Sequence, residues 1–126
     1  MSTIINTPNA PAPIGPYNQA VMAGNMLFVS GQIALDPQSG ELVLTDLTTE
    51  TTKVLENIKA ILTEAGLDFS HIVKTSIFLK DMGDFARVNE IYGSYFTGNY
   101  PARETVQVAA LPKNVNVEIS VIAYKG

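Results

Sequence analysis

Two charged residues near the end of the chain could act together on one small molecule. The chain has two arginines, and one of them, Arg103, begins a strand-like run in PARETVQVAALPKNVNVEIS, which turns at LPKN and returns with Glu118. Side chains alternate across a strand, so packing the apolar faces of both runs against helices fixes which residues share the other face. One permitted register puts Thr105 opposite Glu118 and makes Arg103 its diagonal neighbour, about 7–8 Å away. The sequence therefore predicts a hairpin that carries Arg103 and Glu118 on the side away from the helices.

This pair of residues has two interpretations. A guanidinium binds a carboxylate in a planar, bidentate geometry, and a nearby acid can move protons or orient water, so the pair could form a small anion site. A cross-strand ion pair on the surface is the more common arrangement and contributes about 0–1 kcal/mol. Spacing alone favours the ion pair and leaves the anion site open.

Composition limits the class of protein. With 126 residues, 46% of them hydrophobic and 16% charged, the chain is expected to form one domain over residues 1–126 with a real core. No apolar run approaches the length of a membrane span, and the first residues are not typical of a signal peptide. The absence of cysteine excludes disulfides and thiolate chemistry and is compatible with the cytoplasm, where we expect the protein. The net charge is −4 and the basic residues are scattered singly, which argues against nucleic acid as a partner.

The elements that must position these residues follow from periodicity. Residues 1–16 are rich in Pro and Asn and predict an irregular lead-in. Two strands are expected in YNQAVMA and NMLFVSG, and a third in HIVKTSIFLK. Helical spacing of apolar residues predicts a helix that begins at Thr45 or Asp46 and ends before Gly66. A second helix is expected to begin at Asp81 or Asp84, with a buried stripe formed by Phe85, Val88, Tyr92 and Phe96.

The predicted order is therefore β-β-α-β-α-β-β. Two helices can cover only one face of a mixed sheet, which gives a two-layer α+β domain with an uncovered sheet face.

Five blocks of the sequence, taken in order, resemble the RidA (YjgF) family over nearly the whole chain. They are IGPYNQA, LFVSGQI, VLENIKAILTEAG, IVKTSIFLKDMGDFARVNEIYGSYF and PARETVQVAALPKNVNVEISVIA. The resemblance implies a chorismate-mutase-like fold that forms homotrimers with a ligand cleft at each subunit interface. It also implies hydrolysis of 2-imino or enamine acids, such as 2-iminobutanoate and 2-iminopropanoate, to 2-keto acids and ammonia. Such imines are already electrophilic, so no metal or organic cofactor is expected.

The same resemblance implies roles for individual residues. Arg103 would hold the substrate carboxylate, and Glu118 would position or activate water. The other residues implied to line the cleft, partly from the adjacent subunit, are Tyr17, Ser30, Gly31, Asn89, Thr105 and Pro112. Many members have cysteine where this chain has Thr105 and a small residue where it has Glu104, which should point away from Arg103 by strand alternation.

Two other functions remain open. A non-catalytic regulatory module that binds 2-keto acids would use Arg103 without needing Glu118. An endoribonuclease or translation inhibitor, a label that the family also carries, fits the residues least, because the chain is acidic and has a single histidine, His71.

Overall fold

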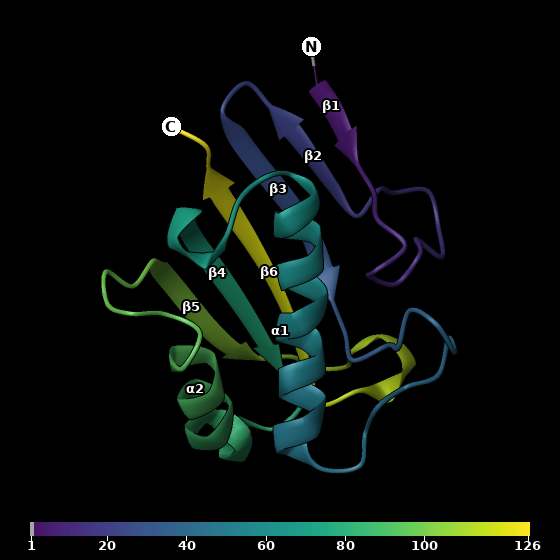
Figure 1. The fold of residues 1–126 in the computed structure, drawn as a ribbon. Helices are drawn as coiled ribbons and strands as arrows, with labels where there is room; N and C mark the ends of the chain where they lie inside the picture. The colour runs from purple at the N-terminus through teal and green to yellow at the C-terminus, as the bar shows by residue number, and fades with distance from the viewer. Residues whose placement is uncertain (1) are drawn as a thin grey trace.

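The structure, a computed structural model, describes residues 2–126. It is an α+β fold in which two α-helices cover one face of a six-stranded mixed sheet with the order β1-β2-β3-β6-β4-β5 (Figure 1). The strands are β1 (Ser2–Ile5), β2 (Ala20–Ala23), β3 (Met26–Gln32), β4 (Ile72–Leu79), β5 (Ala102–Gln107) and β6 (Val117–Tyr124). The helices are α1 (Leu47–Glu64) and α2 (Phe85–Gly93). The predicted two-layer α+β class is confirmed.

The lead-in is more ordered than the sequence predicts. The prediction of irregular chain over residues 1–16 is wrong for Ser2–Ile5, which forms β1 antiparallel to β2; residue 1 lies outside the described residues. Thr3, Ile4 and Ile5 are β-branched and favour a strand, and the prolines and asparagines that suggested irregular chain come after them. The expected strand at residues 17–23 is confined to Ala20–Ala23.

The predicted hairpin at the end of the chain is wrong. β5 pairs with β4 in parallel, and β6 lies on the other side of β4, antiparallel to both β4 and β3. The physical reason is that β4, α2 and β5 form a strand-helix-strand unit, whose crossover helix returns the chain parallel to the first strand. Arg103 therefore lies opposite Thr75 of β4, and Glu118 lies opposite Phe78.

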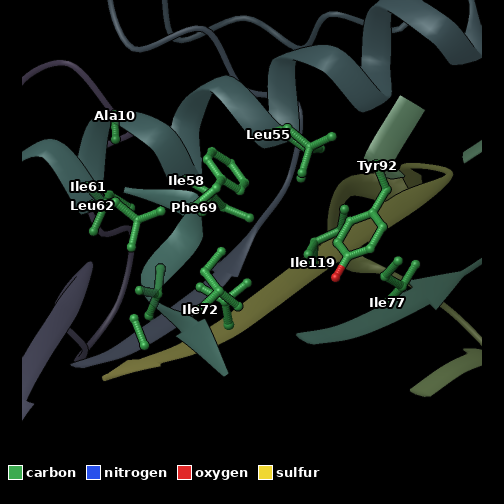
Figure 2. Close-up of a cluster of buried hydrophobic side chains, with 14 of the residues drawn as sticks. Ala10, Leu55, Ile58, Ile61, Leu62, Phe69, Ile72, Ile77, Tyr92 and Ile119 are labelled. Atoms are coloured by element: carbon green, nitrogen blue, oxygen red, sulfur yellow. The ribbon is translucent and has the colours of Figure 1, made fainter. Parts of the chain in front are cut away.

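Helix α1 forms where its caps and apolar stripe predict it. The Asp46 side chain accepts a hydrogen bond from the Thr49 backbone N–H at 2.7 Å, and Gly66 follows the helix with φ +76°, a left-handed conformation that glycine adopts without strain. Figure 2 shows its buried side chains packed over the sheet. They include Leu55, Ile58, Ile61 and Leu62, which cluster with Ile72, Ile77 and Ile119 from the strands.

Helix α2 begins slightly differently from the prediction. Asp81 caps a short 3-10 helix, Met82–Asp84, by accepting from the Gly83 N–H at 2.8 Å, and α2 follows without a side-chain cap. Val88 and Tyr92 of its predicted stripe are buried.

No helix of residues 2–126 is long and apolar enough to cross a membrane.

The other face of the sheet is uncovered and partly apolar. Its exposed large side chains include Phe28, Val106 and Tyr124. Val106 was expected to face the helices, but parallel pairing with β4 turns it outward and turns Arg103 toward α2 instead.

Candidate functional site

Arg103 lies in a pocket between β5 and α2. Its Nη1 donates a hydrogen bond to Asn89 Oδ1 at 2.6 Å, and its guanidinium carbon lies 5.3 Å from the centre of the Tyr92 ring and 5.6 Å from that of Phe85. Both distances are within the range of a cation–π interaction. Tyr100 joins Asn89 and Tyr92 in the lining of the pocket, which has a volume of about 470 Å³. The arrangement holds a fixed cation at the wall of an open pocket.

The Tyr92 side chain is itself held by a hydrogen bond to β4. Its hydroxyl donates to Thr75 Oγ1 at 2.9 Å, and burial raises the pKa of Tyr92 above its ordinary value. The ring that supports Arg103 is therefore neutral and anchored to β4, which fixes where the guanidinium can lie.

No carboxylate neutralises Arg103 within residues 2–126, where the salt bridges are Asp68 with His71 and Glu104 with Lys74. Glu104 points to the opposite face of the sheet, as strand alternation predicts. There it lies 3.0 Å from Lys74 Nζ and accepts a hydrogen bond from the Ser76 hydroxyl. These contacts, the Ser76 bond foremost, lower the pKa of Glu104. The guanidinium of Arg103 is thus free to bind an external anion.

Glu118 lies in a second pocket, on the face of the sheet that the helices leave uncovered. This pocket has a volume of about 410 Å³, and its lining includes Ile14, Tyr17, Ser30, Gly31, Ile33 and Pro112. Burial in these surroundings raises the pKa of the Glu118 carboxyl above its ordinary value. A carboxylate with a raised pKa is a stronger base, which suits the transfer of a proton to or from water near neutral pH.

Gly31 sets the position of the Glu118 carboxyl. A Cβ atom at Gly31 would lie only 2.9 Å from Glu118 Cδ, so any side chain there would push the carboxyl away from β3. The family resemblance implies that Gly31 lines the ligand cleft. In the structure, the group that approaches this glycine most closely is Glu118 itself.

Ser30 and Tyr17 are held by contacts within the chain. The Ser30 hydroxyl donates to the Asn18 carbonyl at 2.6 Å, and the Tyr17 hydroxyl accepts from the Ile14 N–H at 3.3 Å. Ser30 thereby fixes the segment that carries Tyr17, and Tyr17 in turn fixes Ile14 at the rim of the Glu118 pocket.

The structure divides the predicted site residues between two pockets. Asn89 joins Arg103, whereas Tyr17, Ser30, Gly31 and Pro112 join Glu118. The prediction that Arg103 and Glu118 share a face is wrong: β4 separates their strands, and they lie on opposite faces of the sheet. Thr105 lines neither pocket, and its hydroxyl is buried on the helix side without a hydrogen-bond partner among residues 2–126.

Sequence reasoning missed several pocket residues. Tyr92 was assigned only to the core stripe of α2, although its spacing of three from Asn89 puts both on one helix face. Tyr100, Ile14 and Ile33 follow no periodic pattern that would have indicated a site. Within residues 2–126, no three His, Asp or Glu side chains are grouped so that they could hold a metal ion.

The chain is a small α+β domain with Arg103 in one pocket and Glu118 in another, and comparison with known proteins gives its family. The family model described as Endoribonuclease L-PSP matches residues 7–125. The chain is 54% identical over 125 residues to a RutC family protein of Pyrococcus horikoshii, with 99% of both chains covered. It is 50% identical over 123 residues to the 2-iminobutanoate/2-iminopropanoate deaminase of Mus musculus, covering 98% of this chain and 91% of that protein.

The fold is also similar to that of a solved structure. The chain matches the structure of E. coli TdcF with bound serine at a TM-score of 0.94 and 46% identity, covering 98% of this chain and 99% of the other. The protein belongs to the RidA (YjgF) family, as the sequence resemblance predicts. Some relatives, such as the mouse protein, are named as imine deaminases. Others, such as the Pyrococcus protein, are named only by their family.

Proposed function

We propose that the protein hydrolyses 2-imino acids, such as 2-iminobutanoate and 2-iminopropanoate, to 2-keto acids and ammonia. The observation that carries this proposal is that the same chain offers a cation without a carboxylate partner and a half-buried carboxyl group, each in a pocket. Arg103 has no carboxylate partner within residues 2–126, and Glu118 lies in a partly apolar pocket that raises its pKa. A substrate with a carboxylate next to a C=N bond needs both groups.

The two groups would come from neighbouring subunits. In one chain Arg103 and Glu118 lie on opposite faces of the sheet, so one ligand cannot contact both. A homotrimer in which the Glu118 pocket of one subunit meets the Arg103 pocket of the next would complete three clefts. The exposed apolar side chains of the uncovered face, among them Phe28 and Val106, are suited to such an interface.

The chemistry needs no group beyond these. The Arg103 guanidinium binds the substrate carboxylate and orients the C=N bond, while Asn89 and the Tyr92 ring keep the guanidinium in place. Glu118 accepts a proton from water as the water oxygen adds to the imine carbon. Glu118 then returns that proton to the nitrogen, which gives a carbinolamine. In a second transfer through Glu118, the carbinolamine hydroxyl passes its proton to the amino nitrogen as the C=O bond forms and the C–N bond breaks, and a 2-keto acid and ammonia leave.

The relatives support this substrate class. The mouse relative is named for the two imino acids, and the E. coli TdcF structure holds serine, a small 2-amino acid whose carboxylate resembles that of the proposed substrate. The ribonuclease activity in the description of the family model is a weaker candidate for this chain. The chain has a net charge of −4 and one histidine. It therefore offers neither clustered basic residues for RNA nor a histidine pair for cleavage.

A coupled assay tests the proposal. A threonine dehydratase supplies 2-iminobutanoate, and the release of ammonia is followed with the wild type, Arg103→Ala and Glu118→Gln. The wild type should accelerate release. Arg103→Lys, which keeps the charge and loses bidentate binding, is the matched control and should retain part of the activity.

Two results would redirect the assignment. Absence of acceleration by the wild type would refute the deaminase. If 2-ketobutanoate still bound through Arg103 in that case, the non-catalytic keto-acid module would be the better assignment.

A further inference from the structure

A buried carboxylate lies next to the segment that carries Glu118. Glu50, in the first turn of α1, is 0% exposed. Its Oε2 accepts hydrogen bonds from the backbone N–H groups of Asn116 at 2.8 Å and Val117 at 3.3 Å, and its Oε1 accepts from Asn116 Nδ2 at 2.7 Å. Within residues 2–126, Glu50 makes no salt bridge. The hydrogen bonds of the Glu50 side chain thus go to the two residues that precede Glu118.

These two residues connect a strained loop to β6. The loop includes Lys113 and Asn114, which both have positive φ, 53° and 58°, a left-handed conformation that is unfavourable for residues with a side chain. Pro112 of the same loop lines the Glu118 pocket. Asparagine tolerates this conformation better than lysine does, so the strain lies mainly at Lys113. Glu50 contacts the chain where this loop ends, at Asn116 and Val117.

The chemistry of Glu50 is more demanding than packing requires. Burying a carboxylate without a cation is costly unless hydrogen bonds satisfy its oxygens, and here three N–H donors do so. A carboxylate differs from an apolar group in that its oxygens only accept hydrogen bonds, so it fixes the direction of three N–H donors at once. The backbone from Asn116 to Glu118 is thereby held in one orientation.

We propose that Glu50 is a positioning residue for Glu118, acting through the hydrogen bonds that hold the start of β6. This rests on the proposed function, in which Glu118 handles the water. Arg103 lies on the other face of the sheet, in the α2 pocket, and makes no hydrogen bond or salt bridge to this segment. Loss of Glu50 should therefore disturb the chemical step and leave substrate binding nearly intact.

The test compares three variants in the coupled imine assay, with kcat and KM measured over a range of imine supply. Glu50→Leu removes all three acceptors, and its kcat should fall about tenfold to a hundredfold while KM changes less than about twofold. Glu50→Gln keeps an acceptor for the backbone N–H groups, and rotation of the Asn116 amide restores the third bond, so kcat should stay within about threefold of the wild type. Leu62→Ala, at the other end of the same helix, is the control for loss of stability alone.

The outcomes separate positioning from stability. If Leu62→Ala lowers the melting temperature as much as Glu50→Leu but keeps its kcat, the loss in Glu50→Leu comes from misplacement of Glu118. An unchanged kcat in Glu50→Leu would overturn the proposal, as would Glu50→Gln losing as much kcat as Glu50→Leu. If Glu50→Leu does not fold, Asn116→Ala replaces it, because it removes only the side-chain bond; reduced kcat at unchanged KM supports the proposal and unchanged kcat overturns it.

Failure of the proposed function gives a different pattern. In that case the wild type itself shows no acceleration. A wild type that is active, with Glu118→Gln inactive and Glu50→Leu fully active, would refute only the role of Glu50.

Discussion

Mixing two inactive variants should restore activity, because the proposed site takes Arg103 from one subunit and Glu118 from its neighbour. Alone, Arg103→Ala loses charge-assisted hydrogen bonds of about 1.5–3 kcal/mol, which corresponds to about 10- to 100-fold in activity. Glu118→Gln loses proton transfer, which corresponds to about 100-fold or more. Alone, each variant should therefore keep at most about a tenth of wild-type activity in the ammonia-release assay.

The expected recovery follows from counting subunits. In trimers assembled at random from equal amounts of the two variants, a cleft is intact only when its Arg103 side comes from a Glu118→Gln subunit and its Glu118 side comes from an Arg103→Ala subunit. Each condition is met half the time, so about one quarter of the clefts are intact in the random mixture. Every trimer that contains both variants has one intact cleft out of three, so about one third of wild-type activity should return once the unmixed trimers are removed. The two variants are co-expressed with different affinity tags, and mixed assemblies are isolated through both tags before the assay.

The matched control replaces the Arg103→Ala subunit with the Arg103→Ala/Glu118→Gln double variant, which should restore nothing. If mixed assemblies that retain both tags show no recovery with the two single variants, the site is not shared between subunits. That result would refute the reasoning from the opposite faces of the sheet.

Four further predictions concern single side chains. Burial raises the pKa of the Glu118 carboxyl above its unfolded value of about 4.5, so the stability that the protonated group contributes is lost as pH rises through the folded pKa. Glu118→Gln should therefore melt at a higher temperature than the wild type at neutral pH. Thermal melts across the acid range should show this difference in melting temperature disappearing below the unfolded pKa. Equal melting temperatures at every pH would contradict this. Asn89→Asp should raise KM about tenfold, because a carboxylate in place of the oxygen now 2.6 Å from Arg103 Nη1 competes with the substrate; an unchanged KM in initial-rate measurements would argue against Arg103 as the anion site. Thr105→Val should increase the free energy of unfolding by about 1 kcal/mol in urea titrations, because it removes a buried hydroxyl without a partner, and a decrease would show that the hydroxyl is satisfied in the assembled protein. Gly31→Ala should lower kcat about tenfold by displacing the Glu118 carboxyl, and it should add nothing in a Glu118→Gln background, so additive losses would contradict the link.

The helices and the fold class could be predicted because their signals are local. The apolar stripe of α1, Asp46 at its start and Gly66 after its end all lie within one stretch of sequence, and each is used as predicted. The strand pairing could not be predicted in the same way. The alternation in β5 and β6 is compatible with a hairpin, and only the position of β4 between them decides that Arg103 and Glu118 point to different sides.

Most of the residues proposed from the sequence line one of the two pockets, but their division between the pockets was not predicted. Arg103 and Glu118 stood out by residue type, whereas Tyr17, Ser30, Gly31, Asn89 and Pro112 were chosen through the family resemblance. Their division into two pockets depends on strand order, which joins residues far apart in sequence. Glu50 was also out of reach, since a glutamate in the first turn of a helix is normally explained by the helix dipole and solvent.

The place of β6 in the sheet has a consequence for how the protein folds. β6 follows every other strand of residues 2–126 in sequence, yet it lies between β3 and β4 and hydrogen-bonds both (Figure 1). Until β6 has been synthesised, nothing joins β3 to β4, so β1, β2 and β3 cannot form one continuous sheet with β4 and β5. The joining strand is also the strand that carries Glu118, so a nascent chain acquires its proposed catalytic base and its continuous sheet in the same late event.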